Sequence, residues 1–115
     1  MPSDRIFLDS SALFSGILSA AGAARVLLLL SEMKQVSLVV SEQVITETER
    51  AVARKAPRAI PDLRQAILAS SVEIVPTPGK QEVRKHSGLM KHPADIPILL
   101  AAMRERVDFL VTLNT

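Results

Sequence analysis

Short runs of apolar residues alternate with longer amphipathic segments along most of the chain. The first run, Ile6–Leu8, leads directly into Asp9, and a second run of leucine and valine covers Leu38–Val40. Runs of this length that are rich in valine, isoleucine and leucine predict short buried strands. Strands are therefore expected at about residues 5–9, 37–40, 72–75 and 108–112.

Apolar residues at helical spacing fill the segments between these strands. Helices are expected over 12–34 with a break near Gly22, over 41–55, 61–70 and 93–106, while 80–90 fits a polar helix or a loop. Ser41 is a suitable N-cap, and Pro57 restricts the residue before it and so ends the helix that Ser41 opens. In the 61–70 helix we expect Leu63, Ile67 and Leu68 to face the core.

Strands separated by helical segments of crossover length predict an α/β domain. A crossover of this length joins parallel strands and places its helix on a face of the sheet. A chain of 115 residues has the size of one domain. The pattern therefore favours a single domain over residues 1–115, with a parallel sheet of about four strands and helices on both faces.

The composition limits the chemistry that this domain can carry out. Aromatic residues make up 3% of the chain, with no Tyr and no Trp, so platforms for base stacking are nearly absent. The lack of cysteine excludes disulfides, thiolate zinc sites and cysteine nucleophiles. Residues 10–24 carry no charge, but serines and glycines interrupt them and they fall short of the roughly 20 apolar residues of a membrane span. With no signal-peptide pattern, we expect no membrane contact and a cytoplasmic location.

The formal net charge of +2 hides an uneven distribution along the chain. Residues 1–49 carry a net charge of −3, residues 50–92 carry +6, and residues 93–115 carry −1. An acidic pole beside a basic surface fits a metal site that acts on a polyanion. Ordinary solvated helix faces would give the same totals, so the charge alone does not decide between the two explanations.

Four polar residues are expected at the same edge of the parallel sheet. Asp9 follows the first strand, and Asn114 follows the last one. Glu47 lies in the second turn of the helix after the second strand, and Asp95 lies in the first turn of the helix after Pro93. The carboxyl ends of parallel strands meet at one edge, which is where α/β proteins build their sites.

Most of these residues also have a simpler explanation when each is taken alone. Asp9 is then best explained as the cap of the helix that follows it, a role that Ser10 or Ser11 could also fill. Asp95 could be an acid in a first helical turn that the helix dipole stabilises, and Asn114 could be a turn residue. Only their combination points to a shared site.

Helical periodicity does not distinguish Glu47 from Glu49, because both lie about equally far from the centre of the apolar stripe. One such glutamate with Asp9 and Asp95 would place three carboxylates from separate elements at one sheet edge. These carboxylates would repel one another without a cation. A hard divalent ion with oxygen ligands, Mg²⁺ or Mn²⁺, fits this set and can activate water against a phosphodiester.

Four segments in order resemble the PIN-domain family of nucleases, which includes many toxins of bacterial and archaeal toxin–antitoxin pairs of the VapC type. The matching segments, which span nearly the whole chain, are Ile6–Ser11, Leu38–Glu47, His92–Ala102 and Asp108–Asn114. The resemblance implies a three-layer α/β/α sandwich and metal-dependent endoribonuclease chemistry. It also selects Glu47 over Glu49 as the functional acid.

The resemblance assigns roles to individual residues of this chain. Asp9, Glu47 and Asp95 match the acidic positions of the family, so they are expected to be the catalytic ligands of Mg²⁺ or Mn²⁺. Ser11 matches a small polar position beside the metal. Asn114 stands where the family often has a fourth acid, and it can coordinate the ion or hold a water without adding charge.

Members of the family continue beyond the point where this sequence ends. The resemblance therefore implies that residues 1–115 lack a C-terminal strand and the structure that follows it. An uncovered edge strand promotes association, so a partner could supply the missing edge.

The leading hypothesis is a PIN-like ribonuclease that cleaves RNA phosphodiesters as the toxin of a toxin–antitoxin pair. Arg50, Arg54 and Lys55 could hold the RNA backbone, or they could be solvated helix charges. The alternative is a catalytically inactive PIN-like domain that binds other proteins. The candidate partners are an RNA substrate, an antitoxin protein and a second copy of the chain in a homodimer.

Overall fold

A parallel sheet of four strands forms the centre of the structure, a computed structural model that describes residues 4–19, 22–86, 88 and 95–113. The strands are β1 (Arg5–Leu8), β2 (Ser37–Ser41), β3 (Glu73–Val75) and β4 (Phe109–Val111). Their order across the sheet is β3-β2-β1-β4, and every neighbouring pair is parallel. The four predicted strands are therefore confirmed to within one or two residues at each end.

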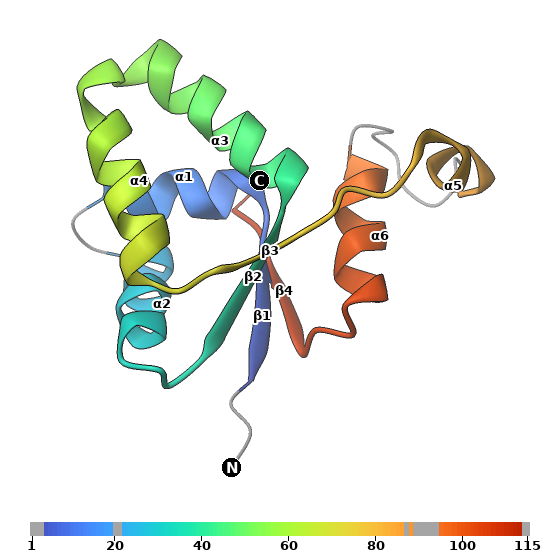
Figure 1. The fold of residues 1–115 in the computed structure, drawn as a ribbon, viewed down its shortest axis with the longest axis horizontal. Helices are drawn as coiled ribbons and strands as arrows, with labels where there is room; N and C mark the ends of the chain where they lie inside the picture. Colours follow the sequence, from blue (N-terminus) through green and yellow to red (C-terminus); the bar gives the residue numbers. More distant parts are fainter. Residues whose placement is uncertain (1–3, 20–21, 87, 89–94, 114–115) are drawn as a thin grey trace.

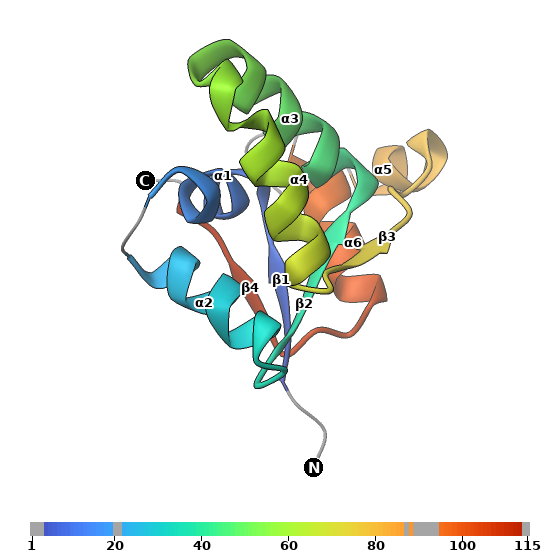
Figure 2. The same ribbon diagram turned by 60° about the vertical axis from the view of Figure 1, so that its left-hand side comes forward.

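Helices cover both faces of the sheet, which gives the predicted three-layer α/β/α sandwich (Figure 1). The helices on one face are α1 (Ser10–Leu18), α2 (Ala23–Glu32), α3 (Glu42–Lys55) and α4 (Ile60–Ala69), with the 3₁₀ turn η1 (Pro57–Ala59) between the last two. The other face carries α6 (Ile96–Arg104), with the short α5 (Lys80–Lys85) beyond it. Figure 2 shows the first group of helices from another side.

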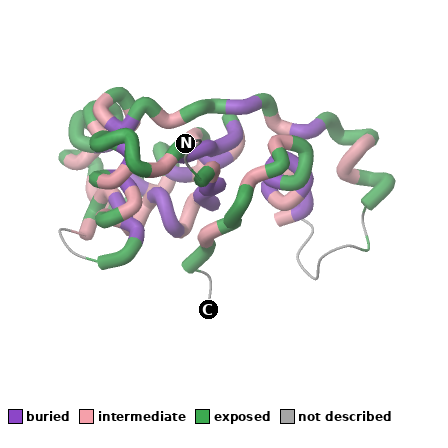
Figure 3. The backbone as a smooth tube through the Cα atoms, turned by 90° about the horizontal axis from the view of Figure 1, so that it is seen from below, coloured by how far each residue is buried: buried purple, intermediate pink, exposed green. Residues whose placement is uncertain are grey.

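The two inner strands lie at the centre of the core. Phe7 and Leu8 of β1 and Val39 and Val40 of β2 are fully buried. Helices on both faces exclude water from these strands, which explains why they are continuous apolar runs rather than alternating patterns. Buried residues accordingly concentrate in the interior and exposed ones on the outer helices (Figure 3).

The predicted helix boundaries agree with the local chemistry. α1 and α2 are separate helices, and Gly22 precedes α2 with a φ of 116°, a conformation that glycine adopts without strain. The Ser41 hydroxyl accepts a hydrogen bond from the Val44 N–H at 3.3 Å, so Ser41 is the N-cap of α3. α3 ends at Lys55, two residues before Pro57. Predictions for residues 89–94, Pro93 included, lie outside the described residues.

No single helix among the described residues is both long and apolar enough to cross a membrane. Within the same described ranges, α1 and α2 reach that length and composition only when they are taken together, and the two are bent by 84° relative to each other.

One predicted core position is wrong. Leu63 of α4 is fully buried and Ile67 is half-buried, but Leu68 is 75% exposed. Residues 63 and 67 lie four positions apart and share one face of the helix, whereas position 68 is turned about 140° from position 63. α4 packs through a narrow stripe, so only one face of this apolar helix reaches the core.

The amino edge of the sheet is held together by Arg5. Its guanidinium pairs with the Glu73 carboxylate at 2.9 Å and with the Glu105 carboxylate at 3.3 Å. Its backbone N–H donates to Asp108 Oδ2 at 2.7 Å. Asp108 therefore lies at the opposite edge of the sheet from Asp9.

α1 and α2 pack closely because position 16 carries no side chain. A Cβ atom at Gly16 would lie 2.8 Å from Leu28 Cδ1 and 3.2 Å from the Ala24 carbonyl oxygen. The first contact is shorter than real Cβ atoms make, and the second involves backbone that cannot rotate away. A larger residue at position 16 therefore requires the Leu28 side chain to move and the backbone at Ala24 to shift by a few tenths of an ångström.

We expect Gly16→Val to lower the free energy of unfolding by about 1–3 kcal/mol, the usual cost of overpacking. Ala53→Val is the matched control, because Ala53 is exposed on α3 and the change tests only helix propensity, worth less than about 0.7 kcal/mol. Urea unfolding of the two variants and the parent chain measures both effects. Equal losses at the two positions would contradict the packing argument.

Candidate metal centre at the carboxyl edge of the sheet

Asp9 forms the junction between β1 and α1 and is only 6% exposed. Its backbone N–H donates to the Val111 carbonyl at 3.2 Å, so it lies beside the carboxyl end of β4 as well. Oδ1 of Asp9 accepts the Ala12 N–H at 2.9 Å and the Ser11 hydroxyl at 2.7 Å. The cap explanation is therefore correct for Oδ1. Among described residues no hydrogen bond goes to Oδ2, which can serve another ligand.

Ser11 connects this carboxylate to the segment that follows β4. Its hydroxyl donates to Asp9 Oδ1 and accepts the Leu113 N–H at 3.1 Å. One hydroxyl thus fixes both the orientation of Asp9 and the path of the chain after the last strand. The position fits the small polar residue expected beside the candidate metal site.

Glu47 is half-buried on the side of α3 that faces α1. Its Oε2 accepts the Gln43 side-chain amide at 3.0 Å, and the Gln43 backbone N–H donates to Thr77 Oγ1 at 2.9 Å. Glu47 lines a cavity of about 360 Å³ between α1 and α3, together with Ser11. Glu49 is exposed and does not line this cavity, so the structure separates the two glutamates that periodicity left equal.

Asp95 lies immediately before α6, and this N-terminal end of α6 is at the carboxyl edge of the sheet (Figure 1). It is half-buried, and its side chain makes no capping hydrogen bond. Its carboxylate is therefore not used to satisfy the backbone N–H groups of α6. Its position at the start of α6 still agrees with the simpler explanation, an acid that the helix dipole stabilises.

The structure places Asp9, Glu47 and Asp95 at one edge but does not gather them tightly. No three Asp, Glu or His side chains within the described part of the chain lie close enough to hold one ion. Asn114, the fourth predicted residue, lies outside the described residues. The set still fits Mg²⁺ or Mn²⁺ in its chemistry, because it consists entirely of oxygen donors.

A basic surface begins beside this edge and continues along α3 and α4. Its exposed cations are Arg50, Arg54 and Lys55 of α3, Arg58 of η1 and Arg64 of α4. None of the five forms an ion pair with another described residue. Their charge is thus available to an anionic partner.

Sequence reasoning missed Phe14, which lies between the acidic edge and the basic surface. Its ring lines the same cavity as Glu47, and Lys55 Nζ lies 5.5 Å from the ring centroid. The only indication in the sequence is helical spacing, because Ser10 and Phe14 are four residues apart on α1. That spacing alone predicts a shared helix face and not a contact with α3.

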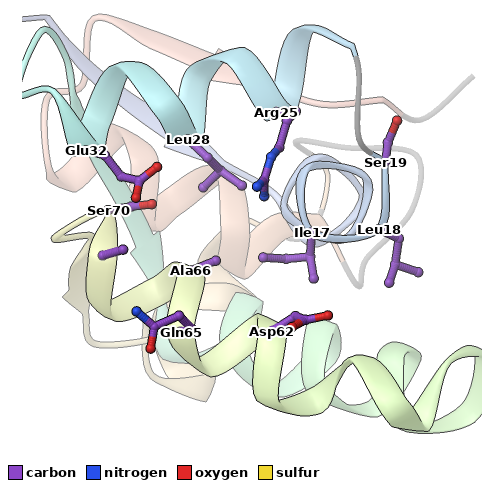
Figure 4. A pocket seen from close by; sticks show the side chains of 11 residues that line it. Ile17, Leu18, Ser19, Arg25, Leu28, Glu32, Asp62, Gln65, Ala66 and Ser70 are labelled. Atoms are coloured by element: carbon purple, nitrogen blue, oxygen red, sulfur yellow. The ribbon is translucent and has the colours of Figure 1, made fainter.

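A larger cavity of about 460 Å³ lies elsewhere, between α1, α2 and α4 (Figure 4). Leu28 and Ile17 form part of its apolar wall, and Arg25, Glu32 and Asp62 surround it with charge. None of the predicted site residues that the structure describes lines this second cavity. Its size alone therefore does not make it the site of chemistry.

Comparison with known proteins identifies what the chain is similar to. The sequence profile of the PIN domain matches residues 5–115. No curated protein sequence matches the chain. Several solved structures do match the chain, and three of them are described in the next paragraph.

VapBC2 from Rickettsia felis, bound to a DNA fragment from their promoter, matches with a TM-score of 0.71 and 22% identity, over 96% of this chain and 87% of that one. PAE2754 from Pyrobaculum aerophilum matches with a TM-score of 0.71 and 17% identity, over 96% and 80% of the two chains. Mycobacterium tuberculosis VapC20, a Sarcin-Ricin loop cleaving toxin, matches with a TM-score of 0.69 and 18% identity, over 95% and 89%. At these identities the likeness shows a shared fold.

We expect Ser11→Ala to loosen the segment after β4, because it removes the acceptor of the Leu113 N–H and a donor to Asp9. Amide hydrogen exchange at Leu113 should become faster, and the free energy of unfolding should fall by about 0.5–1.5 kcal/mol. Ser15→Ala is the control, since Ser15 lines the same cavity without a hydrogen bond to Leu113. Unchanged exchange at Leu113 in Ser11→Ala would contradict this role.

Proposed function

The chain belongs to the PIN domain family, and from this membership we propose that it is a metal-dependent nuclease that hydrolyses RNA phosphodiesters. The observation that carries the proposal is the buried Asp9 carboxylate at the joined ends of β1 and β4. Two hydrogen bonds hold it through one oxygen. The similarity in fold to VapC20, a Sarcin-Ricin loop cleaving toxin, supports the choice of RNA.

We infer that Asp9, Glu47 and Asp95 hold the ion, Mg²⁺ or Mn²⁺, with Asn114 as an uncharged fourth ligand. When bound, such an ion supplies an activated water and neutralises charge on the phosphodiester. Ser11 and the Ala12 N–H keep Asp9 in one orientation by occupying Oδ1.

Two further groups prepare the edge for an anionic substrate. Gln43 restrains Glu47 through its side-chain amide, which limits the directions in which that carboxylate can point. The exposed cations Arg50, Arg54 and Lys55 lie farther along the same helix and attract the RNA backbone. Because these cations form no ion pair with Glu47 or Asp9, they can bind the polyanion without neutralising the acidic ligands.

We further propose that the chain acts as the toxin of a toxin–antitoxin pair. The support is the family match and the similarity in fold to VapBC2 and VapC20. Co-purification with the product of an adjacent gene tests this role. The absence of any such complex would count against the toxin role and would leave the nuclease proposal standing.

Asp9→Asn should lower Mn²⁺-dependent RNA cleavage by at least about 100-fold, because it removes a charged ligand. Asparagine caps helices as well as aspartate does, so the fold should persist. Glu49→Gln is the matched control, a charge removal on the exposed side of α3. Steady-state cleavage of a labelled RNA measures both variants.

Full cleavage by Asp9→Asn, or an equal loss in Glu49→Gln, would contradict the assignment of the site. A melting scan gives an independent check. A free Mn²⁺ concentration of about 100 times Kd should stabilise the parent chain by about 2.7 kcal/mol and leave Asp9→Asn nearly unchanged. A parent chain that neither binds Mn²⁺ nor cleaves RNA would instead support a non-catalytic PIN-like interaction domain.

A further inference from the structure

The cavity of about 360 Å³ between α1 and α3 has two chemically different ends. Its lining from α3 is Glu47, Ala51 and Lys55, which are spaced four residues apart and therefore form one row on the helix. Eight residues of helix span about 12 Å, so the acidic and basic ends of the cavity are well separated. The small side chain of Ala51 leaves the middle of the row open.

The wall opposite this row comes from the first turns of α1. Ser10, Ser11 and Ser15 line it with hydroxyl groups, and Phe14 adds the face of an aromatic ring. The Ser11 hydroxyl already bonds to Asp9 and Leu113, whereas the hydroxyls of Ser10 and Ser15 can donate to or accept from ribose and phosphate oxygens. A volume above about 300 Å³ is in the range of small-ligand sites.

Lys55 is held over this cavity by Phe14. Its Nζ lies 5.5 Å from the ring centroid, a distance at which the ring attracts a cation. Lys55 is exposed and forms no ion pair with another described residue, so its charge stays available. The other two aromatic residues of the chain lie elsewhere, Phe7 inside the core and Phe109 on β4.

We propose that this cavity binds the RNA strand beyond the nucleotide that adjoins the scissile bond, with Lys55 contacting a phosphate there and Phe14 as the positioning residue of Lys55. The inference rests on the proposed function, since Glu47 at the acidic end marks where the bond is cleaved. The separation of roughly 12 Å between the acidic and basic ends of the cavity exceeds the distance between neighbouring phosphates of a stacked strand. A phosphate at Lys55 therefore lies more than one step along the strand from the scissile phosphate.

Fluorescence anisotropy with a short, labelled single-stranded RNA of mixed sequence tests this subsite separately from cleavage. Lys55→Gln should weaken binding about fivefold and lower the slope of log K against log salt by about one, the effect of losing one phosphate contact. Phe14→Leu keeps an apolar residue of similar length but removes the ring face. It should weaken binding severalfold in the parent chain and have little further effect when Lys55 is already glutamine.

Lys34→Gln and Phe109→Leu are the matched controls, because both residues are exposed and neither lines the cavity. Both controls should bind RNA as the parent does. Unchanged affinity and salt slope in Lys55→Gln would overturn the proposal, as would a parent chain that binds no RNA. An equal loss from Phe14→Leu with and without Lys55 would overturn the positioning role.

The two proposals fail in different ways. Lys55-dependent binding by a chain that never cleaves RNA would support the subsite and contradict the nuclease function. Metal-dependent cleavage with the same KM in the parent, Lys55→Gln and Phe14→Leu would support the nuclease and overturn the subsite. Because Lys55 is exposed, its replacement keeps the test valid even where Phe14→Leu lowers stability.

Discussion

The rest of the structure depends on the connection between β1 and α1, which consists of one residue. β1 ends at Leu8 and α1 begins at Ser10, so Asp9 must end the strand and cap the helix at once. Its N–H is fixed by β4, and one carboxylate oxygen is fixed by the first turn of α1. A side chain constrained from both sides loses little conformational entropy on binding a ligand, which is the physical basis of preorganisation.

The parallel sheet also sorts the acidic residues by edge. At the amino edge the Arg5 guanidinium forms ion pairs with Glu73 and Glu105, and the Asp108 carboxylate accepts the Arg5 backbone N–H. At the carboxyl edge, neither Asp9 nor Glu47 pairs with a cation among the described residues. A cation from solution would therefore offset carboxylate charge at the carboxyl edge that no described side chain offsets.

The fold could be predicted from the sequence because its strands and helix boundaries are encoded locally. Continuous apolar runs specified the strands, and Ser41, Gly22 and Pro57 marked where helices begin and end. Leu68 was misplaced because its apolar character was given more weight than its angular position, which is about 140° from Leu63 on the helix. The order β3-β2-β1-β4 depends on contacts between distant segments and was not predictable from periodicity.

The candidate site was predictable only in part, for a related reason. A helical wheel measures how far Glu47 and Glu49 lie from the apolar stripe, and it does not show that α1 packs on one side of α3. That packing places Glu47, Ala51 and Lys55 in one cavity with Phe14. One face of α3 thus carries an acid at one end and a cation at the other. The rise of this helix therefore sets the distance between the candidate metal ligand and the candidate phosphate ligand, and its packing against α1 places both at the same cavity.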